Sequence, residues 1–268
     1  KKKKKFKFKF KKEKKLMFFN RLEFSIMTNK IAKKCTVPPS IYSNTEIEQI
    51  FHRFSLQNPH PQGELYYTNP FTLLVAVLLS AQTTDTGVNK VTPQLFNKAQ
   101  SAEEMAKLSE EEISHYIRSI GLWKTKAKNI ACLSQILWQQ YQGHVPASRE
   151  ELTNLPGVGR KTANVVLNIA FHQDTLAVDT HIFRIANRLQ LAPGKTADEV
   201  EKKLLQIIPK PYLHHAHLWL ILHGRYTCKA RRPLCEQCII ADLCKAPIKT
   251  SNIAAPIIPP TLHLENAR

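Results

Sequence analysis

Helix-start signatures recur along this chain and restrict what it can fold into. In each of them a hydroxyl residue stands three positions before a glutamate, and the two side chains can satisfy free backbone N–H groups of a first helical turn. The pairs are Thr45/Glu48, Ser101/Glu104, Ser109/Glu112, Ser148/Glu151 and Thr196/Glu199. Signals of β-strands hardly occur between them. The sequence therefore predicts an all-α protein of roughly ten helices joined by short loops.

Further stretches refine this helical prediction. Asn69-Pro70 is a typical entry to a helix, because proline fits the first helical position. The apolar run from Phe71 to Ala81 is too short to span a bilayer, so it predicts a buried helix. Apolar residues also recur at helical spacing over 125–141 and 211–226. The glycines that we expect at helix ends are Gly121 and Gly143.

Positive charge is concentrated at the start of the chain. The formal net charge is +18, and residues 1–34 carry 15 lysines and arginines against 2 glutamates. This low-complexity segment repels itself and cannot pack a core, so we expect a disordered basic extension over 1–41. It also lacks the apolar region of a secretory signal. We expect the functional protein to start at Met27, or alternatively at Met17; a nonspecific nucleic-acid arm and a tether to anionic membranes stay open as roles for the extension.

A glycine-rich turn, LPGVG at 155–159, separates a short helix capped by Ser148 from a helix expected over 160–171. Together they form a helix-hairpin-helix pattern. Gly157 and Gly159 let the backbone take unusual conformations and approach a partner closely. Free N–H groups at the start of the second helix suit an anion, and with Arg160 beside them a DNA phosphate is the natural guest. The alternative is a plain helix–helix turn with solvated cations.

Lys161 follows directly and has more than one possible role. As an isolated residue it can be a phosphate contact or a solvated charge. A nucleophilic lysine must spend time uncharged, and a helix start beside another cation disfavours the charged amine. The location therefore permits covalent catalysis without proving it.

Four of the six cysteines fall within a short stretch near the end of the chain, whereas Cys35 and Cys132 stand alone. The stretch reads C-x6-C-x2-C-x5-C, and its cysteines are Cys228, Cys235, Cys238 and Cys244. Clustered thiols indicate a metal centre in a reducing compartment. Only one close pair occurs, which favours an iron–sulfur cluster, with zinc as the alternative. The loop between the first two cysteines displays three cations, Lys229, Arg231 and Arg232, which we expect to contact DNA phosphates.

The ordered set LPGVGRKTANVV, VDTHIFR and the cysteine pattern after HGRYTC closely resembles the endonuclease III family, bifunctional DNA glycosylases and AP lyases of the helix-hairpin-helix superfamily. The resemblance runs from about Ile47 to Cys244 and includes NPFTLLVAVLLSAQTTD and IRSIGLWKTKAKNI. It implies that Lys161 attacks C1′ of the damaged nucleotide, expels the base and forms a Schiff base, after which β-elimination cuts the strand. Asp179 matches the catalytic carboxylate, although its position also suits a helix N-cap.

The resemblance assigns roles to further residues. Gln82 matches the residue that enters the gap left by a flipped nucleotide, and Leu122 matches a wedge on the opposite strand. Without the family, Leu122 reads as core and Gln82 as a helix-end residue. Asp85 and His181 are plausible polar groups of the pocket, each with a cap or a satisfied histidine as the plainer interpretation. The four cysteines become ligands of a [4Fe–4S] cluster.

The resemblance also implies an all-α fold of two domains. A six-helix barrel is expected over 63–173 with the helix-hairpin-helix at about 149–171. A cluster domain is expected from 42–62 plus 174–250, with a tail at 251–268. The implied protein is a monomer that repairs oxidised pyrimidines and abasic sites in double-stranded DNA, in the bacterial cytoplasm at the nucleoid and not at a membrane. An adenine-mismatch glycosylase and a non-enzymatic DNA-binding module are the rival interpretations; the lysine at 161 argues against the first.

Overall fold

The computed structural model describes residues 40–247. Within this range every regular element is helical and no strand is present. None of these helices is long and apolar enough to cross a membrane. The predicted extension lies outside the described residues except for Ser40 and Ile41, and so do both proposed start sites and the tail at 251–268.

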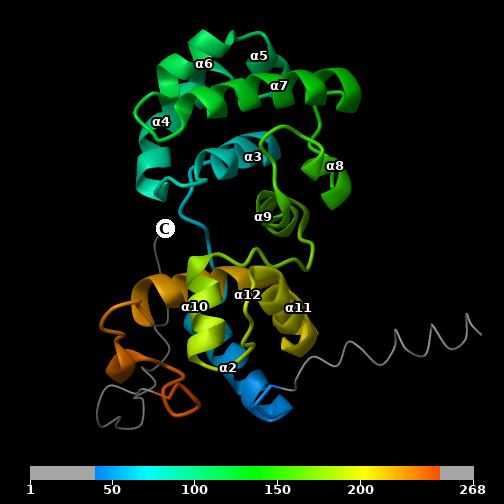
Figure 1. The fold of residues 1–268 in the computed structure, drawn as a ribbon. Coiled ribbons are helices and arrows are strands. Elements are labelled where there is room, and N and C mark those ends of the chain that lie inside the picture. The colour runs from blue at the N-terminus through cyan, green and yellow to red at the C-terminus, as the bar shows by residue number, and fades with distance from the viewer. Residues whose placement is uncertain (1–39, 248–268) are drawn as a thin grey trace, which may run out of the picture. The chain divides into compact units, whose positions relative to one another are not determined.

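The helices follow one another through short connections (Figure 1). Their bounds are α2 Asn44–Gln57, α3 Pro70–Leu79, α4 Asp85–Lys98, α5 Ala102–Ala106, α6 Glu110–Ile117, α7 Trp123–Tyr141, α8 Arg149–Thr153, α9 Arg160–Phe171, α10 Thr180–Arg188, α11 Ala197–Ile207 and α12 Lys210–Leu222, followed by a π-helical turn η1 His223–Thr227 and a 3-10 turn η2 Cys235–Gln237.

Helix α3 is the centre of a first hydrophobic core, which holds buried side chains from Phe71 to Leu167. Asn69 caps its first turn, Thr72 returns the bond to the cap, and Pro70 occupies the first position, as predicted. Every residue from Phe71 to Leu79 is buried. Helix α3 packs against α9 and α4, and α7 covers α5 and α6 (Figure 1).

The predicted helix starts are mostly confirmed. Ser101 and Ser109 form complete capping boxes with their glutamates. At Ser148 and Thr196 the hydroxyl accepts the expected backbone bond, but the glutamate does not return one to the cap. The prediction at Thr45/Glu48 was wrong by two residues. The box that forms there is Ser43/Glu46, since the sequence offers two overlapping versions of the same pattern.

The two glycines predicted at helix ends behave differently. Gly143 follows α7 and has a φ of 81°, so that it ends the helix as expected. The prediction for Gly121 was wrong, because α6 already ends at Ile117. The left-handed conformation in this connection falls instead on Leu122, with a φ of 58°, which serves as the N-cap of α7.

A second hydrophobic core joins α2, near the start of the described chain, to α10, α11, α12 and the cysteine stretch. Its buried side chains run from Tyr42 to Phe54 and from Leu176 to Ala241. The hydroxyl of Tyr42 donates to the carbonyl of Leu189 at 2.9 Å and accepts from the backbone N–H of Lys245 at 2.9 Å. These two bonds attach the residues before α2 to the end of α10 and to the chain just after the cysteine stretch. The predicted domain limits, 63–173 and 42–62 with 174–250, stay predictions.

Buried polar groups on α9 connect the first core to the second. The Asn164 side chain donates to the carbonyl of Leu176 at 2.9 Å and to Glu201 at 3.2 Å. Asn168 donates to the carbonyls of Thr175 at 3.2 Å and His214 at 3.0 Å. Because a buried amide left without partners costs free energy, these bonds fix the position of α9 against α11 and α12.

Arg160 completes this connection. Its guanidinium donates to Glu201 at 3.0 and 3.2 Å, and the Glu201 side chain is only 5% exposed. The same guanidinium lies 3.8 Å from Asp198. The Glu201 carboxylate, which is nearly buried, thus depends on a cation that is itself partly exposed to solvent.

We expect Arg160→Met to destabilise the protein by about 2 kcal/mol, because it leaves the buried Glu201 carboxylate without its counter-ion. Partial exposure of Arg160 keeps the effect below that of a fully buried pair. Urea denaturation followed by circular dichroism measures it. The matched control is Lys107→Met, which breaks an exposed i,i+4 pair with Glu103 and should cost less than about 0.5 kcal/mol. Equal effects of the two substitutions would contradict a connecting role for Arg160.

Candidate functional site

The turn at 155–159 has the predicted hairpin form, since it joins α8 to α9, whose bounds match the expected helix. Gly157 has a φ of +76°, and a Cβ there would lie 2.5 Å from Nδ2 of Asn129. Conformation and packing therefore both require this glycine. Gly159 is different. It is the N-cap of α9 with a φ of −90°, and a Cβ there would meet nothing within 4 Å. The protein's own atoms do not require it, so the space it opens is available to a partner.

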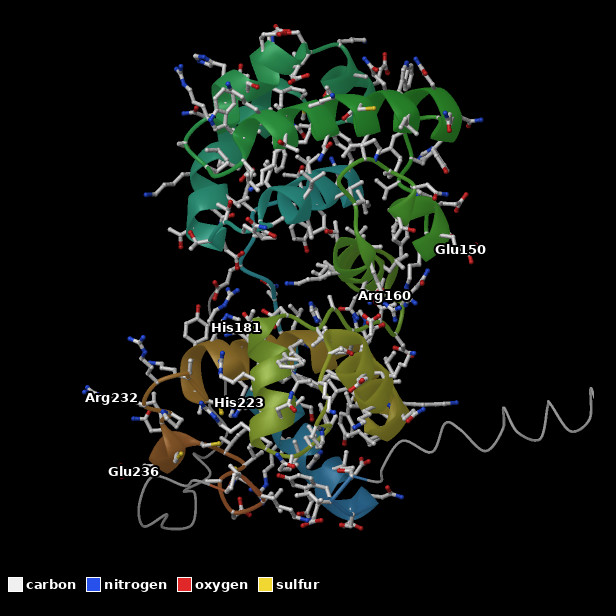
Figure 2. The ribbon with its side chains drawn as sticks, viewed as in Figure 1. Glu150, Arg160, His181, His223, Arg232 and Glu236 are labelled. Carbon is white, nitrogen blue, oxygen red and sulfur yellow. The ribbon has the colours of Figure 1, made fainter. Side chains whose placement is uncertain are left out.

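The two cations that follow the turn point to different surroundings. Arg160, at the start of α9 (Figure 2), donates from its guanidinium to Glu201 of α11, although its side chain stays partly exposed to solvent. A phosphate would therefore have to compete with Glu201 for the Arg160 guanidinium. Lys161 is exposed and lines a cavity. Of the pair, Lys161 is the one whose amine faces open space.

This cavity has a volume of about 290 Å³ and gathers the two predicted catalytic residues, the two predicted pocket groups and the predicted gap-filling residue. They are Gln82, Asp85, Lys161, Asp179 and His181. They come from the loop after α3, the start of α4, the start of α9 and the start of α10. Residues distant in sequence and drawn from both cores therefore form one site.

Asp179 has the double role that its sequence context predicts. It is the N-cap of α10, and its Oδ1 accepts the backbone N–H of Ile182 at 2.8 Å. This bond uses one of the two carboxylate oxygens and fixes the orientation of the group. His181, in the first turn of the same helix (Figure 2), has its ring 3.3 Å from Arg184, so its imidazole is also held from within the second core.

His217 is a lining residue that the sequence reasoning missed. It lies on α12, is 2% exposed, and its Nδ1 has no hydrogen-bond partner. Burial lowers the pKa of His217 to about 4; Asp179 opposes this shift and Lys161 adds to it. The imidazole is therefore neutral at neutral pH. The only signal in the sequence was a histidine within the apolar stretch HLWLIL, which reads equally well as core.

Arg225 is the second missed residue of the cavity wall, and it explains Asp85. The Arg225 guanidinium donates to Asp85 at 2.7 Å and to Glu64 at 2.5 Å. Tyr226 also donates to Glu64. Asp85 is thus an ion-pair partner across the cavity rim, where it joins the start of α4 to η1.

The residue predicted to enter the gap in DNA and the residue predicted as a wedge on the opposite strand share an unusual backbone conformation. Gln82 has a φ of 56° and Leu122 a φ of 58°, and both side chains are exposed, Leu122 by 58%. Leu122 is therefore not core. A Cβ on Gly121 would lie 4.0 Å from the carbonyl oxygen of Gln82, so the two loops lie against each other. Gln82 also lines the cavity, which places the pair at its edge.

The four clustered cysteines line a second cavity. Arg188 of α10 donates to the Sγ of Cys228 at 3.5 Å, and burial raises the pKa of the Cys238 thiol to about 12. A thiolate there therefore needs a positive centre beside it. Within residues 40–247, no group of three or more His, Cys, Asp or Glu side chains converges as a single metal ion requires. Four cysteine thiols that line one cavity match the ligand set of a [4Fe–4S] cluster.

The backbone of the loop between Cys228 and Cys235 is bonded to α10, a helix of the second core. Arg188 donates to the carbonyls of Lys229 at 2.6 Å and Ala230 at 2.9 Å. The side chains of Lys229, Arg231 and Arg232 are exposed (Figure 2 labels Arg232). The loop thus presents its three cations outward, as predicted.

Comparison with known proteins assigns the class of this molecule. Residues 75–210 match the HhH-GPD superfamily of base excision DNA repair proteins, and residues 228–244 match the iron–sulfur binding domain of endonuclease III. The second match begins and ends on the first and last of the clustered cysteines.

Individual relatives agree with these family matches. The chain is 55% identical to endonuclease III of Rickettsia prowazekii over 76% of its own length and 96% of the relative. It is 54% identical to endonuclease III of Escherichia coli over 74% of its own length and 93% of the relative. The solved structure of a trapped endonuclease III–DNA covalent intermediate superposes with a TM-score of 0.71 at 44% identity, covering 76% of this chain and 97% of the other. The chain therefore belongs to the endonuclease III family.

The predicted family, the two-domain all-α helix-hairpin-helix fold and the enzyme class are thereby confirmed. The chain is a base excision repair enzyme, a DNA glycosylase for oxidised pyrimidines with AP lyase activity. Its cofactor is a [4Fe–4S] cluster, which answers the question of iron against zinc. The roles of single residues stay predictions.

We expect alanine substitutions of the two hairpin glycines to impair different properties, stability at Gly157 and DNA binding at Gly159. Gly157→Ala should lower the stability by at least about 2 kcal/mol, because its left-handed backbone and the contact with Asn129 both oppose a side chain. Gly159→Ala should leave the thermal midpoint unchanged but weaken DNA binding, because its methyl group enters the space left open for a partner. Thermal unfolding and fluorescence anisotropy with a duplex separate the two effects. Wild-type affinity of Gly159→Ala would show that the space has no role in binding.

Proposed function

We propose that Lys161 is the nucleophile and Asp179 the catalytic carboxylate of this enzyme. The observation that carries the assignment is their meeting in one cavity, Lys161 from the start of α9 and Asp179 from the start of α10. The relative caught as a covalent intermediate with DNA supports a nucleophile in this family. A lysine amine that forms a Schiff base is an established form of covalent catalysis.

The reaction then follows from the residues in the cavity. The bond from the Lys161 amine to C1′ forms as the bond from C1′ to the base breaks, and the departing base carries off the electron pair and takes up a proton. Opening of the bond between C1′ and the ring oxygen, which takes up a proton, leaves a Schiff base. A base then removes a C2′ proton, a double bond forms between C2′ and C3′, and the 3′ phosphate leaves, which cuts the strand. Water hydrolyses the Schiff base and frees Lys161.

Asp179 acts where positive charge develops. Its carboxylate, oriented by the bond to Ile182, can stabilise the cationic sugar and accept a proton from the attacking amine. His217 is neutral in the wall of the same cavity, so it adds no positive charge that would oppose this step.

We assign DNA binding to three parts of the surface. The free N–H groups at the start of α9, beside the open space at Gly159, suit a phosphate. Gln82 and Leu122 at the cavity edge fill the gap left by the extruded nucleotide, and the loop cations Lys229, Arg231 and Arg232 contact the backbone. Arg160 stays a predicted contact that would first have to leave Glu201.

We assign the ligands of the cluster to the four cysteines that line the second cavity, Cys228, Cys235, Cys238 and Cys244. When bound, the cluster supplies a covalent cross-link between the two ends of the basic loop. The residues of the chain do the rest: Arg188 holds the loop carbonyls, and the loop directs its cations outward.

The proposed substrate is double-stranded DNA that contains an oxidised pyrimidine or an abasic site, bound by a monomer. We place this activity in the bacterial cytoplasm, at the nucleoid. Clustered thiols that bind metal rather than form disulfides support a reducing compartment, and the relatives are bacterial.

Lys161→Gln is expected to abolish strand scission and borohydride-trapped adducts on abasic DNA, because an amide cannot form a Schiff base. Its affinity for the same duplex should change by less than about tenfold. Gel electrophoresis and anisotropy give the two quantities. If affinity disappears as completely as cutting, Lys161 is only a DNA contact and the proposed nucleophile is wrong.

Asp179→Asn separates the structural role of this residue from its catalytic role. Asparagine caps a helix about as well as aspartate, so the stability should stay within about 0.5 kcal/mol. The excision rate should fall by about 100-fold or more, because the charge that stabilises the cationic sugar is lost. The exposed Asp174 provides the control variant Asp174→Asn, for which we expect wild-type rates. Full activity of Asp179→Asn would remove the carboxylate from the mechanism.

A further inference from the structure

A lysine is buried where two DNA-facing loops meet. Lys126 lies in the first turn of α7 and is 5% exposed. Its Nζ donates to the carbonyl of Leu79 at 2.9 Å and to Oγ1 of Thr83 at 2.8 Å. One side chain therefore connects α7 to the end of α3 and to the loop that follows it.

Both partners of the buried Nζ are uncharged, and within residues 40–247 no carboxylate pairs with it. Burial lowers the pKa of Lys126, as expected for a cation removed from water. A methionine would fill this space without that desolvation cost. The charge is stabilised instead by the C-terminal end of α3, since Leu79 is the last residue of that helix. The position thus uses a lysine where packing alone would not require one.

The loops joined by Lys126 each carry an exposed residue with left-handed backbone, Gln82 in one and Leu122 in the other. This conformation costs a non-glycine residue roughly 1 kcal/mol or more and persists only where the surroundings fix it. Thr83, which accepts from the Lys126 side chain, directly follows Gln82. The backbone N–H of Lys126 donates to the carbonyl of Leu122 at 3.0 Å. This second bond is the first backbone hydrogen bond of α7 and does not depend on the side chain, so the lysine amine itself connects the loop of Gln82 to the helix that Leu122 caps.

We propose that Lys126 is the positioning residue that holds Gln82 and Leu122 as a preformed pair, ready to fill the gap left by an extruded nucleotide. The inference rests on the proposed function, because it concerns the same DNA-binding edge of the cavity. Lys126 lies outside the cavity lined by Lys161 and Asp179, so it acts through the two loops and not on the reacting atoms.

The physical reason is preorganisation. Taking a base out of the stack costs a few kcal/mol, and the side chains that replace it recover part of that cost. If the loops first had to adopt the left-handed backbone, less of that cost would be recovered, because the free energy spent on ordering them reduces the binding free energy. Removing the Lys126 amine should therefore slow the reaction only on substrates in which a base must be unstacked.

The test compares two substrates and two variants of the cluster-loaded protein. The variants are Lys126→Met, which keeps the volume and removes the donors, and Lys128→Met, which changes an exposed lysine two positions along the same helix. One substrate is a duplex with an oxidised pyrimidine paired in the stack. The other is a single-stranded oligonucleotide with a preformed abasic site, which needs no extrusion.

We expect Lys126→Met to slow excision from the duplex by about tenfold or more, while borohydride trapping on the single strand stays within about twofold of wild type. Lys128→Met should match the wild type on both. Equal losses on the two substrates, or no loss on either, would overturn the proposal. A wild type that fails to trap abasic DNA would instead remove the proposed function, so the two failures are distinguishable.

A spectroscopic readout separates positioning from general damage to the fold. In a Lys161→Gln background, 2-aminopurine beside the lesion should brighten on binding as its neighbour leaves the stack, and Lys126→Met should reduce that rise. If Lys126→Met does not fold, judged by circular dichroism and the visible absorbance of the cluster, Thr83→Val keeps the amine and its bond to Leu79 and removes only the acceptor on the loop of Gln82. It should reduce the brightening in the same direction, and an unchanged signal would count against the proposal.

Discussion

Helix α9 has to fit two hydrophobic cores at once, and the active site depends on how it does so. One face packs on α3 through apolar side chains, as an ordinary amphipathic helix would. The other is bound to the second core by buried amides, Asn164 and Asn168, that reach carbonyls of the following chain. Because such amides cannot be left unpaired without a large cost, they fix the helix in position and in rotation. Lys161, in its first turn, is thereby held across the cavity from Asp179.

Beside that cavity, residues with strained backbone likewise lie against neighbouring groups that restrain them. Gly157 takes the left-handed conformation that the hairpin needs at little cost, whereas Gln82 and Leu122 take it without the freedom of glycine. Polar side chains stand behind each of these places: the half-buried Asn129 against Gly157, and the buried Lys126 against the two loops. This side of the molecule therefore combines exposed, strained backbone with a firmly bonded layer underneath.

Local rules predicted much of this structure, and long-range pairing accounts for what they missed. Ser101 and Ser109 start helices because the necessary partner lies three residues away. The rule failed at Thr45, where Ser43 offered the same pattern two residues earlier, and at Gly121, where Leu122 took the left-handed position instead. Arg160 could not be matched with Glu201 from sequence, since 41 positions separate them. The resemblance to a known family identified Lys161, Asp179 and the four cysteines as site residues. No local signal in the sequence distinguished His217 from a core residue.

The inward turn of Arg160 has a consequence for how the enzyme responds to ionic strength. With its charge balanced by Glu201 and Asp198, the hairpin would meet a phosphate mainly through backbone dipoles, which displace few condensed counterions. Of these two elements, the exposed loop that carries Lys229, Arg231 and Arg232 would then release more ions on association than the hairpin. In the DNA-binding mode proposed above, the salt dependence of affinity thus draws on the cysteine stretch, whereas added salt would weaken the contact of the hairpin little.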